Sequence, residues 1–309
     1  MELSVIIPTH NPHAERLRRT LAGLRAQTLP IARWETLLVD NASQPEVDPR
    51  AFSESAPANL RIVREPQLGL TSARRRGFAE VRAPLCVLVD DDNVLAPDYL
   101  AHVVHLFGEH PRVGALGGKS LPEFEVEPPE WAREFLPLLA LRDLGDQPCC
   151  SDGLRPAGAT HNLYPAKAAP IGAGMAIRRD AAMRWLTGAD TGLSDRRGSD
   201  LTSGGDNDIV LTVMAQGWEV AYSPELTLTH LIPASRLMPE YLARLNHGIQ
   251  KSWMQVLAKH RASPWPPVAG WTVPLRQCKA WFTHRAWAGP AERTRWQGAC
   301  GHFEGRAVN

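Results

Sequence analysis

The stretch VLVDDDN, at Val87–Asn93, ends an apolar run in three consecutive carboxylates, those of Asp90, Asp91 and Asp92. Stacked acids at the end of a strand repel one another unless a cation or solvent relieves them. Hard divalent cations such as Mg²⁺ prefer oxygen ligands and often bridge one or two carboxylates to phosphates. The stretch therefore predicts a metal and diphosphate site at the carboxyl edge of a sheet, where open α/β folds tend to bind ligands.

Strands and helices alternate around this stretch. Apolar runs predict four buried strands, at Leu3–Pro8, Thr36–Asp40, Leu60–Glu65 and Pro84–Asp90. Apolar residues at helical spacing predict helices around Leu17–Leu24, over Gly69–Val81 and over Pro97–Glu109. The alternation predicts an α/β fold with a mostly parallel sheet flanked by helices. The polar runs Thr9–Asn11, Asp40–Asn41 and Asp90–Asp92 each follow a predicted parallel strand, so we expect them at one edge of the sheet.

The second half of the chain is less regular. Residues Lys119–Pro170 are rich in Pro and Gly, and a long irregular stretch within an ordered domain favours a binding loop. The pattern beyond it predicts, in order, a strand at Ile171–Ile177, a short helix from Asp180, a polar loop at Asp195–Gly205, a helix from Asn207, two short strands within Trp218–His230 and a helix over Pro239–His260.

Composition indicates a soluble globular protein of one large domain or two modest ones. No run reaches the roughly 18 consecutive apolar residues of a membrane-spanning helix. The N-terminus starts directly with an apolar strand, so we expect no signal peptide. Five cysteines at irregular spacing argue against a disulfide framework and favour a reducing cytosol. We therefore expect a cytoplasmic protein.

The C-terminal part of the chain carries a net positive charge. From Leu231 onward, eleven Arg and Lys residues stand against three Glu, and this part holds six of the ten tryptophans. Trp combined with Arg or Lys suits a membrane interface, where each ring sits at headgroup level, so one interpretation is contact with an anionic membrane. The other is that these tryptophans pack the segment onto the body of the protein. Pro264, Pro266, Pro267 and Pro274 would break any long helix here.

Six motifs follow one another in a recognisable order: SVIIPTHN (Ser4–Asn11), LLVDNAS (Leu37–Ser43), GLTSARRRGF (Gly69–Phe78), VLVDDD (Val87–Asp92), GAGMAIRRD (Gly172–Asp180) and GGDNDIVLTVMAQGWEVAYSPE (Gly204–Glu225). As a set they resemble glycosyltransferase family 2, the inverting enzymes of the GT-A (Rossmann-like) fold, over about Leu3–Arg236. The resemblance implies a catalytic domain at 1–236, with a nucleotide-binding half (1–118) and an acceptor-binding half (119–236), and a basic, Trp-rich helical extension at 237–309.

The resemblance also implies roles for single residues. Asp40 would accept from the nucleotide base, Asp90 would face the ribose, and Asp92 would ligate the metal on the diphosphate. Asp206 would be the base that deprotonates the acceptor hydroxyl, with Asp208 as the fallback. The implied set is Pro8, Thr9, Asn11, Asp40, Arg74, Asp90 and Asp91 for the nucleotide, Asp92 and His230 for the metal, Asp206 for catalysis, and Gly174, Met175 and Asp208 for the acceptor.

The chemistry of the reaction supports these roles. A departing nucleoside diphosphate develops negative charge that a cation stabilises, and an acceptor hydroxyl needs a carboxylate to take its proton. Each residue also has a local alternative. An Asp after a strand ordinarily forms a turn, Asp206 could cap the helix that follows it, and His230 could be a packed histidine. The family usually has Glu where this chain has Gly205, which weakens the analogy at the acceptor site.

We therefore expect a non-processive inverting glycosyltransferase that uses Mn²⁺ or Mg²⁺. It would move a sugar from a nucleoside diphosphate, with UDP as the first candidate, to a saccharide or lipid-linked acceptor. The acceptor would be held by Lys119–Pro170, and we expect no nucleic acid as a partner. Glu292–Trp296 echoes the Q-x-x-R-W signature of processive relatives but lies beyond the proline-rich break. One alternative is a sugar-phosphate nucleotidyltransferase, which would need a glycine-rich basic loop at Thr9–Arg16. The other is a non-catalytic nucleotide-sugar or carbohydrate-binding protein on the same scaffold.

Overall fold

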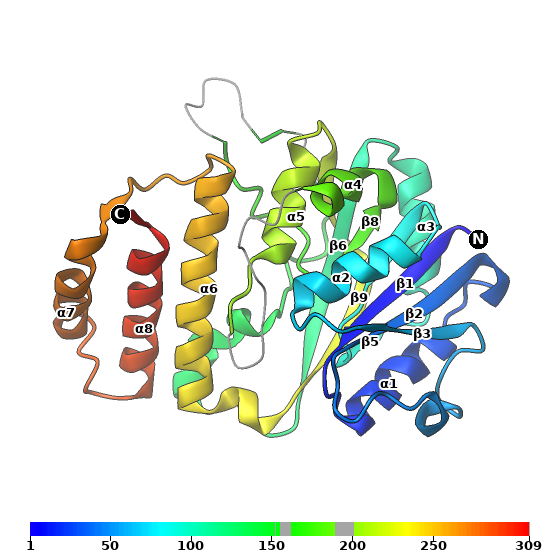
Figure 1. The fold of residues 1–309 in the computed structure, drawn as a ribbon, viewed down its shortest axis with the longest axis horizontal. Coiled ribbons are helices and arrows are strands. Elements are labelled where there is room, and N and C mark those ends of the chain that lie inside the picture. Colours follow the sequence, from blue (N-terminus) through cyan, green and yellow to red (C-terminus); the bar gives the residue numbers. More distant parts are fainter. Residues whose placement is uncertain (152, 155–161, 189–200, 309) are drawn as a thin grey trace.

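The structure of the protein is a computed structural model, which describes residues 1–151, 153–154, 162–188 and 201–308. A central sheet runs through the N-terminal part of the chain, and helices cover both of its faces (Figure 1). The last three helices stand side by side at one end of this α/β unit (Figure 1). The predicted α/β fold with a helical C-terminal region is confirmed.

Among the described residues the central sheet has nine strands: β1 (Leu3–Thr9), β2 (Trp34–Asn41), β3 (Leu60–Glu65), β4 (Leu85–Leu88), β5 (Asn93–Leu95), β6 (Val113–Phe124), β7 (Cys149–Ser151), β8 (Ala176–Arg178) and β9 (Glu219–Ile232). Their order is β3-β2-β1-β4-β8-β6-β9-β5, and β7 pairs with β9. The first four strands along the chain pair in parallel, as predicted. β8 runs antiparallel to both of its neighbours, so the sheet is more mixed than the mostly parallel one expected. A separate small sheet joins β10 (Val268–Ala269) to β11 (Ala307–Val308).

The described α-helices are α1 (Ala14–Arg25), α2 (Leu70–Glu80), α3 (Tyr99–Glu109), α4 (Arg179–Thr187), α5 (Gly205–Met214), α6 (Pro239–Lys259), α7 (Val273–Thr283) and α8 (Pro290–Gly305). Short 3-10 helices lie at η1 (Ile31–Arg33), η2 (Pro49–Phe52), η3 (Glu130–Leu139), η4 (Ala234–Leu237) and η5 (Gly270–Thr272). Successive side chains of a strand point to opposite faces, which separates two cores. Val5 and Ile7 of β1 pack with α1 and α3, whereas Ile6 packs with α2, α4 and α5.

Several predicted boundaries differ from the observed ones. The two short strands expected within Trp218–His230 form one strand, β9. Helix α5 begins at Gly205 with Gly204 as its N-cap residue, so Asp206 lies in the first turn and is not the cap. The irregular stretch Lys119–Pro170 contains the end of β6, all of η3 and β7. Residues 152 and 155–161 of that stretch, and residues 195–200 of the polar loop, lie outside the described residues.

The C-terminal helices pack closely because glycines of α8 face α6. A Cβ atom at Gly301 would lie 2.1 Å from the carbonyl oxygen of His247, so only glycine allows this approach. Pro264, Pro266 and Pro267 fall between α6 and α7, and Pro274 lies in the first turn of α7, where a missing N–H costs little. Trp281 and Trp296 pack ring against ring, as the packing interpretation expects, whereas Trp271 is 78% exposed.

Within the described part of the chain, no helix is both long enough and apolar enough to cross a membrane.

Candidate functional site

A pocket of about 250 Å³ opens at the carboxyl ends of β1, β2 and β4. The parallel pairing of these strands brings their terminal polar residues together, which confirms that the polar runs share one edge of the sheet. The wall contains Asn41 and Arg236 together with six of the predicted site residues, Pro8, Thr9, Asp90, Asp91, Asp92 and His230.

Asp92 is buried and contacts three neighbouring side chains. Its Oδ2 accepts a hydrogen bond from Arg236 Nη2 at 2.7 Å, and its Oδ1 accepts from Asn93 Nδ2 at 3.2 Å. His230 Nε2 lies 3.4 Å from the same Oδ1. The pairing of β5 with β9 sets Asn93 opposite His230, which carries the end of β9 and the following η4 to the acid triplet.

His230 faces this cluster through Nε2, which lies 3.0 Å from Arg236 Nη1 and 3.4 Å from Asp92 Oδ1. The first contact is a hydrogen bond when Nε2 carries a lone pair, and the second when Nε2 carries a proton. Nδ1 is buried and has no hydrogen-bond partner among the described residues. An imidazole nitrogen beside a carboxylate is a suitable metal ligand.

The donor set fits a hard divalent cation that arrives with a nucleotide. Among the described residues, no group of three His, Cys, Asp or Glu side chains is arranged to hold a metal by itself. Mg²⁺ and similar ions are usually held by one or two carboxylates together with substrate phosphates and water. The carboxylates around Asp92 could supply the protein's share of such a shell, and diphosphate oxygens would supply the rest.

Asp91 lies between Thr9 and its two acidic neighbours. The Thr9 hydroxyl donates to Asp91 Oδ2. Burial, together with the negative charges of Asp92 and Asp90, raises the pKa of Asp91 to about 7. The triplet therefore keeps part of its charge neutralised by a proton near neutral pH, and a cation that binds there would displace that proton.

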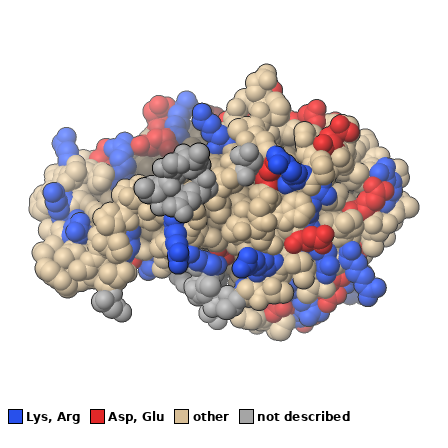
Figure 2. All heavy atoms as spheres, turned by 90° about the horizontal axis from the view of Figure 1, so that it is seen from above, with Lys and Arg blue, Asp and Glu red and all other residues tan. Residues whose placement is uncertain are grey.

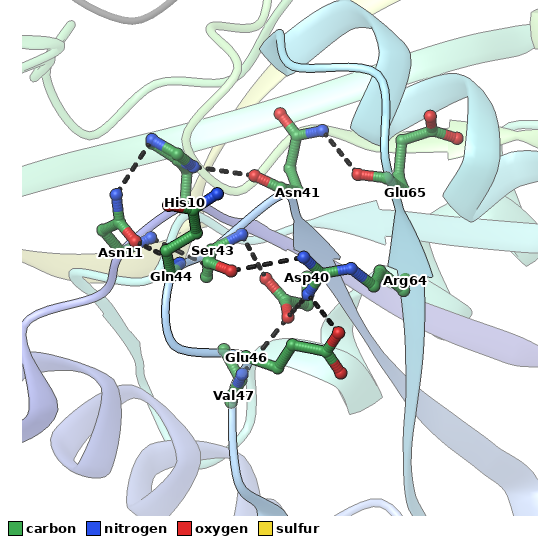
Figure 3. Close-up of polar contacts among 10 residues, drawn as sticks. All are labelled: His10, Asn11, Asp40, Asn41, Ser43, Gln44, Glu46, Val47, Arg64 and Glu65. Atoms are coloured by element: carbon green, nitrogen blue, oxygen red, sulfur yellow. Dashed lines mark hydrogen bonds and ion pairs between the residues drawn. The ribbon is translucent and has the colours of Figure 1, made fainter.

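Asp40 points into the loop that follows β2 (Figure 3). Its carboxylate accepts from the backbone N–H groups of Ser43 and Val47, at 3.1 and 3.2 Å, and pairs with Arg64 at 2.9 Å. The side chain is almost fully buried, and Asn41 is the residue of this pair that lines the pocket. The structure thus places Asp40 as the anchor of the 42–47 loop beside the pocket.

Asn11 joins the loops after β1 and β2 (Figure 3). Its N–H donates to Ser43 Oγ at 2.9 Å, and its Oδ1 accepts from the Gln44 N–H at 2.8 Å. Asn11 and Ala42 have positive φ angles of 47° and 55°. Asn adopts this conformation readily, whereas it strains Ala42, and such strain clusters at functional sites. Asn11 therefore shapes the rim of the pocket from outside its wall.

Asp206 belongs to a second polar group near the first turn of α5. It is half-buried, and its Oδ2 accepts from the Gly172 N–H at 3.0 Å. A Cβ atom at Gly172 would lie 2.5 Å from Arg74 Nη2, so the glycine lets Arg74 and Asp206 approach the same backbone segment. Arg74 is itself buried, and it follows Ala73, which lines the pocket. Asp206 and Arg74 thus lie close to one another, outside the wall that holds the acid triplet.

Asp208 is engaged by three donors from two other helices. Its carboxylate accepts from Trp185 Nε1 at 3.1 Å, Lys259 Nζ at 2.9 Å and His260 Nε2 at 2.7 Å. Burial raises the pKa of this carboxyl, but the hydrogen bonds from His260 and Lys259 outweigh it and lower the pKa. A buried carboxylate held in this way ties α5 to α4 and to the end of α6.

Gly174 and Met175 lie at the bend before β8. Gly174 has a φ of +76°, and its carbonyl accepts from the Tyr99 hydroxyl at 2.6 Å. The Met175 side chain is fully buried in the core with α2, α4 and α5. Met175 therefore has no side-chain surface for an acceptor, and a contact at this bend would come from the backbone.

Two residues that the sequence pattern did not single out lie around Asp206. The Tyr164 hydroxyl donates to Asn207 Oδ1, next to Asp206 in the chain. Burial lowers the pKa of Arg142, and the charge of Asp206 opposes that shift. Burial raises the pKa of Tyr164, and the charge of Asp206 adds to that shift. Both residues come from the Pro- and Gly-rich stretch, where no periodicity marks a functional side chain.

Comparison with known proteins identifies a family whose sequence pattern this chain matches. The model of the family described as "Glycosyl transferase family 2" matches residues 4–185. An uncharacterized protein, y4gI of Sinorhizobium fredii, is 27% identical over 249 residues, which are 76% of this chain and 25% of that protein. The O-antigen biosynthesis protein RfbC of Myxococcus xanthus is 29% identical over 147 residues, 43% of this chain and 11% of that protein. The chain thus spans a quarter or less of the length of these relatives.

Solved structures share the fold at low sequence identity. The mannosyltransferase PcManGT from Pyrobaculum calidifontis, in complex with GDP-Man and Mn²⁺, superposes with a TM-score of 0.59 at 19% identity, covering 97% of this chain and 73% of that one. TarS residues 1–349 of S. aureus, in complex with UDP, gives a TM-score of 0.51 at 12% identity, covering 98% of this chain and 89% of that one.

Proposed function

This chain belongs to glycosyl transferase family 2, and we propose that it is a non-processive, inverting glycosyltransferase. It would move a sugar from a nucleoside diphosphate, with UDP as the first candidate, to a saccharide or lipid-linked acceptor. One observation carries the proposal: three carboxylates, His230 and Arg236 converge on a single pocket at the carboxyl edge of the sheet. In the proposed division, residues 1–236 form the catalytic domain and residues 237–309 an extension.

The acid triplet and its partners would bind the diphosphate. Asp92 and His230 would hold a Mn²⁺ or Mg²⁺ ion, and Asp90 would face the ribose. When bound, such a cation supplies the positive charge that offsets the leaving diphosphate. The PcManGT complex with GDP-Man and Mn²⁺ and the TarS complex with UDP support this class of donor. Arg236, which lines the pocket, would pair with phosphate oxygens once its guanidinium no longer pairs with Asp92.

Asp206 would act as the general base. An acceptor hydroxyl is a weak nucleophile until a carboxylate within hydrogen-bond reach takes its proton. The Gly172 N–H fixes one carboxylate oxygen of Asp206, which limits the rotation of the side chain. Asp208, with its three donors, would position this turn of α5 and would not take the proton itself. Attack from the side opposite the diphosphate would invert the anomeric centre.

The acceptor would enter from the side formed by Lys119–Pro170, with Arg142 and Tyr164 near the base. The bend at Gly174 and Met175 would shape this side through its backbone. A lipid-linked acceptor would require the enzyme to work at a surface, so the proposal includes peripheral contact with an anionic membrane on its cytoplasmic face. The eleven basic residues from Leu231 onward support this part of it.

Calorimetric titration tests the donor half of the proposal. UDP, GDP and dTDP are titrated, with and without Mn²⁺, into the wild-type protein and into Asp92→Ala. Asp98→Ala, which changes an exposed acid at the start of α3, is the matched control. We expect one nucleotide to bind in a Mn²⁺-dependent manner to the wild type and the control but at least about tenfold more weakly to Asp92→Ala.

Two results would count against this assignment. If no nucleotide binds in the presence of metal, the transferase proposal fails. If a nucleotide sugar binds but no acceptor preparation gives turnover, a non-catalytic binding protein on this scaffold becomes the better description.

A further inference from the structure

Helix α7 is the outermost element at one end of the molecule, separated from α6 by α8 (Figure 1). Its inner face is packed: the Trp281 and Trp296 rings lie 4.7 Å apart in an edge contact, and Trp296 Nε1 donates to the Gln277 carbonyl at 3.1 Å. These contacts hold α7 in one orientation, which determines the side chains on its outer face.

The outer face is apolar as well. Leu275 and Phe282, seven residues apart on α7, lie along one side of the helix and are 66% and 64% exposed. Trp271 of η5, just before α7, is 78% exposed. Trp287, 56% exposed, extends this line, because its ring lies 5.9 Å from that of Phe282. We call these four residues the α7 ridge. A helix that is apolar on both faces is normally covered on both, so the ridge requires a partner surface.

The charges around the ridge point to the kind of partner. The 51 residues from Tyr241 to Ala291 contain no Asp or Glu. Arg276, Lys279 and Arg285 are exposed beside the ridge. Figure 2 shows basic side chains spread among uncharged ones at the end of the molecule formed by the C-terminal helices. An anionic surface complements this arrangement, whereas a second copy of the chain would bring like charges together.

We propose that the α7 ridge inserts into the interfacial layer of an anionic lipid membrane. Aromatic rings favour the headgroup level, and Arg and Lys beside them attract anionic lipids. The inference rests on the proposed function and deepens it by naming the element that would hold the enzyme where a lipid-linked acceptor is found. Each basic residue near such a surface strengthens binding about fivefold.

Vesicle sedimentation with the full chain tests this inference without donor or acceptor. Vesicles of phosphatidylcholine alone are compared with vesicles that also contain phosphatidylglycerol. We expect binding to the anionic vesicles only, weakened about tenfold or more in Phe282→Glu and about 25-fold in Arg276→Gln/Lys279→Gln. Ile31→Glu is the matched control, because Ile31 is a 48% exposed apolar residue of η1, far from α7 in the chain. It should bind as the wild type does.

The remaining outcomes each overturn the inference. Equal binding to both kinds of vesicle, no binding at all, or unchanged binding of Phe282→Glu would do so. A concentration-dependent dimer that Phe282→Glu abolishes, without vesicle binding, would assign the ridge to a second copy. Nucleotide titration of the same variants separates the two proposals: loss of vesicle binding with intact nucleotide binding concerns the ridge alone.

Discussion

Arg236 donates to Asp92 at 2.7 Å across 144 residues of sequence. The Asp92 side chain is 4% exposed and that of Arg236 is 18% exposed, so the pair is largely withdrawn from water. Burial opposes the charge of Arg236, but Asp92 and the other carboxylates outweigh it and raise the pKa of Arg236. The guanidinium occupies one oxygen of the carboxylate that we propose as a metal ligand, so arginine and cation would compete for Asp92.

This competition predicts the effect of Arg236→Gln. Without the guanidinium, Asp92 is left as a buried and less compensated charge, so we expect the metal-free protein to lose about 2–3 kcal/mol of its free energy of unfolding. Mn²⁺ with UDP should then raise the melting temperature of the variant by more than it raises that of the wild type. Thermal unfolding of both proteins, in EDTA and in Mn²⁺ with UDP, measures the difference.

Arg293→Gln, an exposed change on α8, is the control for loss of a positive charge. An equal gain from Mn²⁺ and UDP in Arg236→Gln and the wild type would show that Arg236 and the cation do not compete.

The raised pKa of Asp91 predicts how the free energy of unfolding depends on pH. Its pKa rises from 3.8 to about 7 in the folded state, so the folded protein binds this proton more tightly than the unfolded chain does. That contribution is complete below about pH 4 and is lost as the pH rises through about 7. Asp91 keeps some exposure, so we expect about 1–2 kcal/mol, less than the roughly 4 kcal/mol of a fully shielded group.

Urea unfolding in EDTA at pH 5 and pH 8 measures this contribution. The stability of the wild type relative to Asp91→Asn should fall by more than half of that amount between the two values, since Asp91 of the unfolded chain is already ionised at pH 5. Parallel pH dependence in the two proteins would mean that Asp91 titrates as an ordinary aspartate.

Local sequence could predict the acid triplet, whereas its partner His230 is implied only by the resemblance to the family. A strand followed by three carboxylates is visible within seven residues, and the parallel neighbours of β4 follow from the alternation of strands and helices. Arg236 and His230 reach the triplet through the pairing of β9 with β5 and β6, a register that no local pattern encodes. The direction of Asp40 likewise depends on the positive φ of Ala42, which turns the loop back over the carboxylate.

Gly and Pro account for the misplaced boundaries. Gly204 and Gly205 are typical of a loop, yet α5 starts there, since Gly204 is the N-cap residue. Pro224 suggests a break in the strand, but β9 continues past it because its pairing with β6 shifts register between Gly117 and Lys119. In both places tertiary packing overrides a local preference.

The ion pairs of Asp208 predict that Asp208→Asn destabilises the protein at neutral pH but not in acid. Asp208→Asn leaves Lys259 and His260 without their shared carboxylate, so we expect a cost of about 2–3 kcal/mol at pH 7. The pKa of Asp208 is lowered in the folded state, so its contribution is present above the unfolded value of 3.8 and is lost as the pH falls through the folded value. Urea unfolding at pH 7 and well below pH 3.8, at about pH 2, should therefore show a gap that closes in acid. A gap of the same size at both values would contradict this account, and Asp98→Asn controls for loss of an exposed acid.

If Asp206 is the general base, its substitution should slow turnover and leave nucleotide binding nearly unchanged. General bases contribute about 10²–10⁴ to a rate, so Asp206→Asn should lower kcat by that factor, because an amide cannot take the acceptor proton. The side chain lies outside the wall of the pocket that holds the acid triplet, so nucleotide affinity should change less than about threefold. The control is Asp180→Asn, an exposed acid in the first turn of α4 that occupies the position Asp206 has in α5. Transfer assays with the donor identified by calorimetry measure kcat, and titration of the same samples measures nucleotide affinity.

If Asp206→Asn keeps more than a tenth of the wild-type kcat, another group takes the proton. If it loses nucleotide binding as well, Asp206 acts on the donor side, and the second polar group around Gly172 and Arg74 would have to be assigned to the diphosphate.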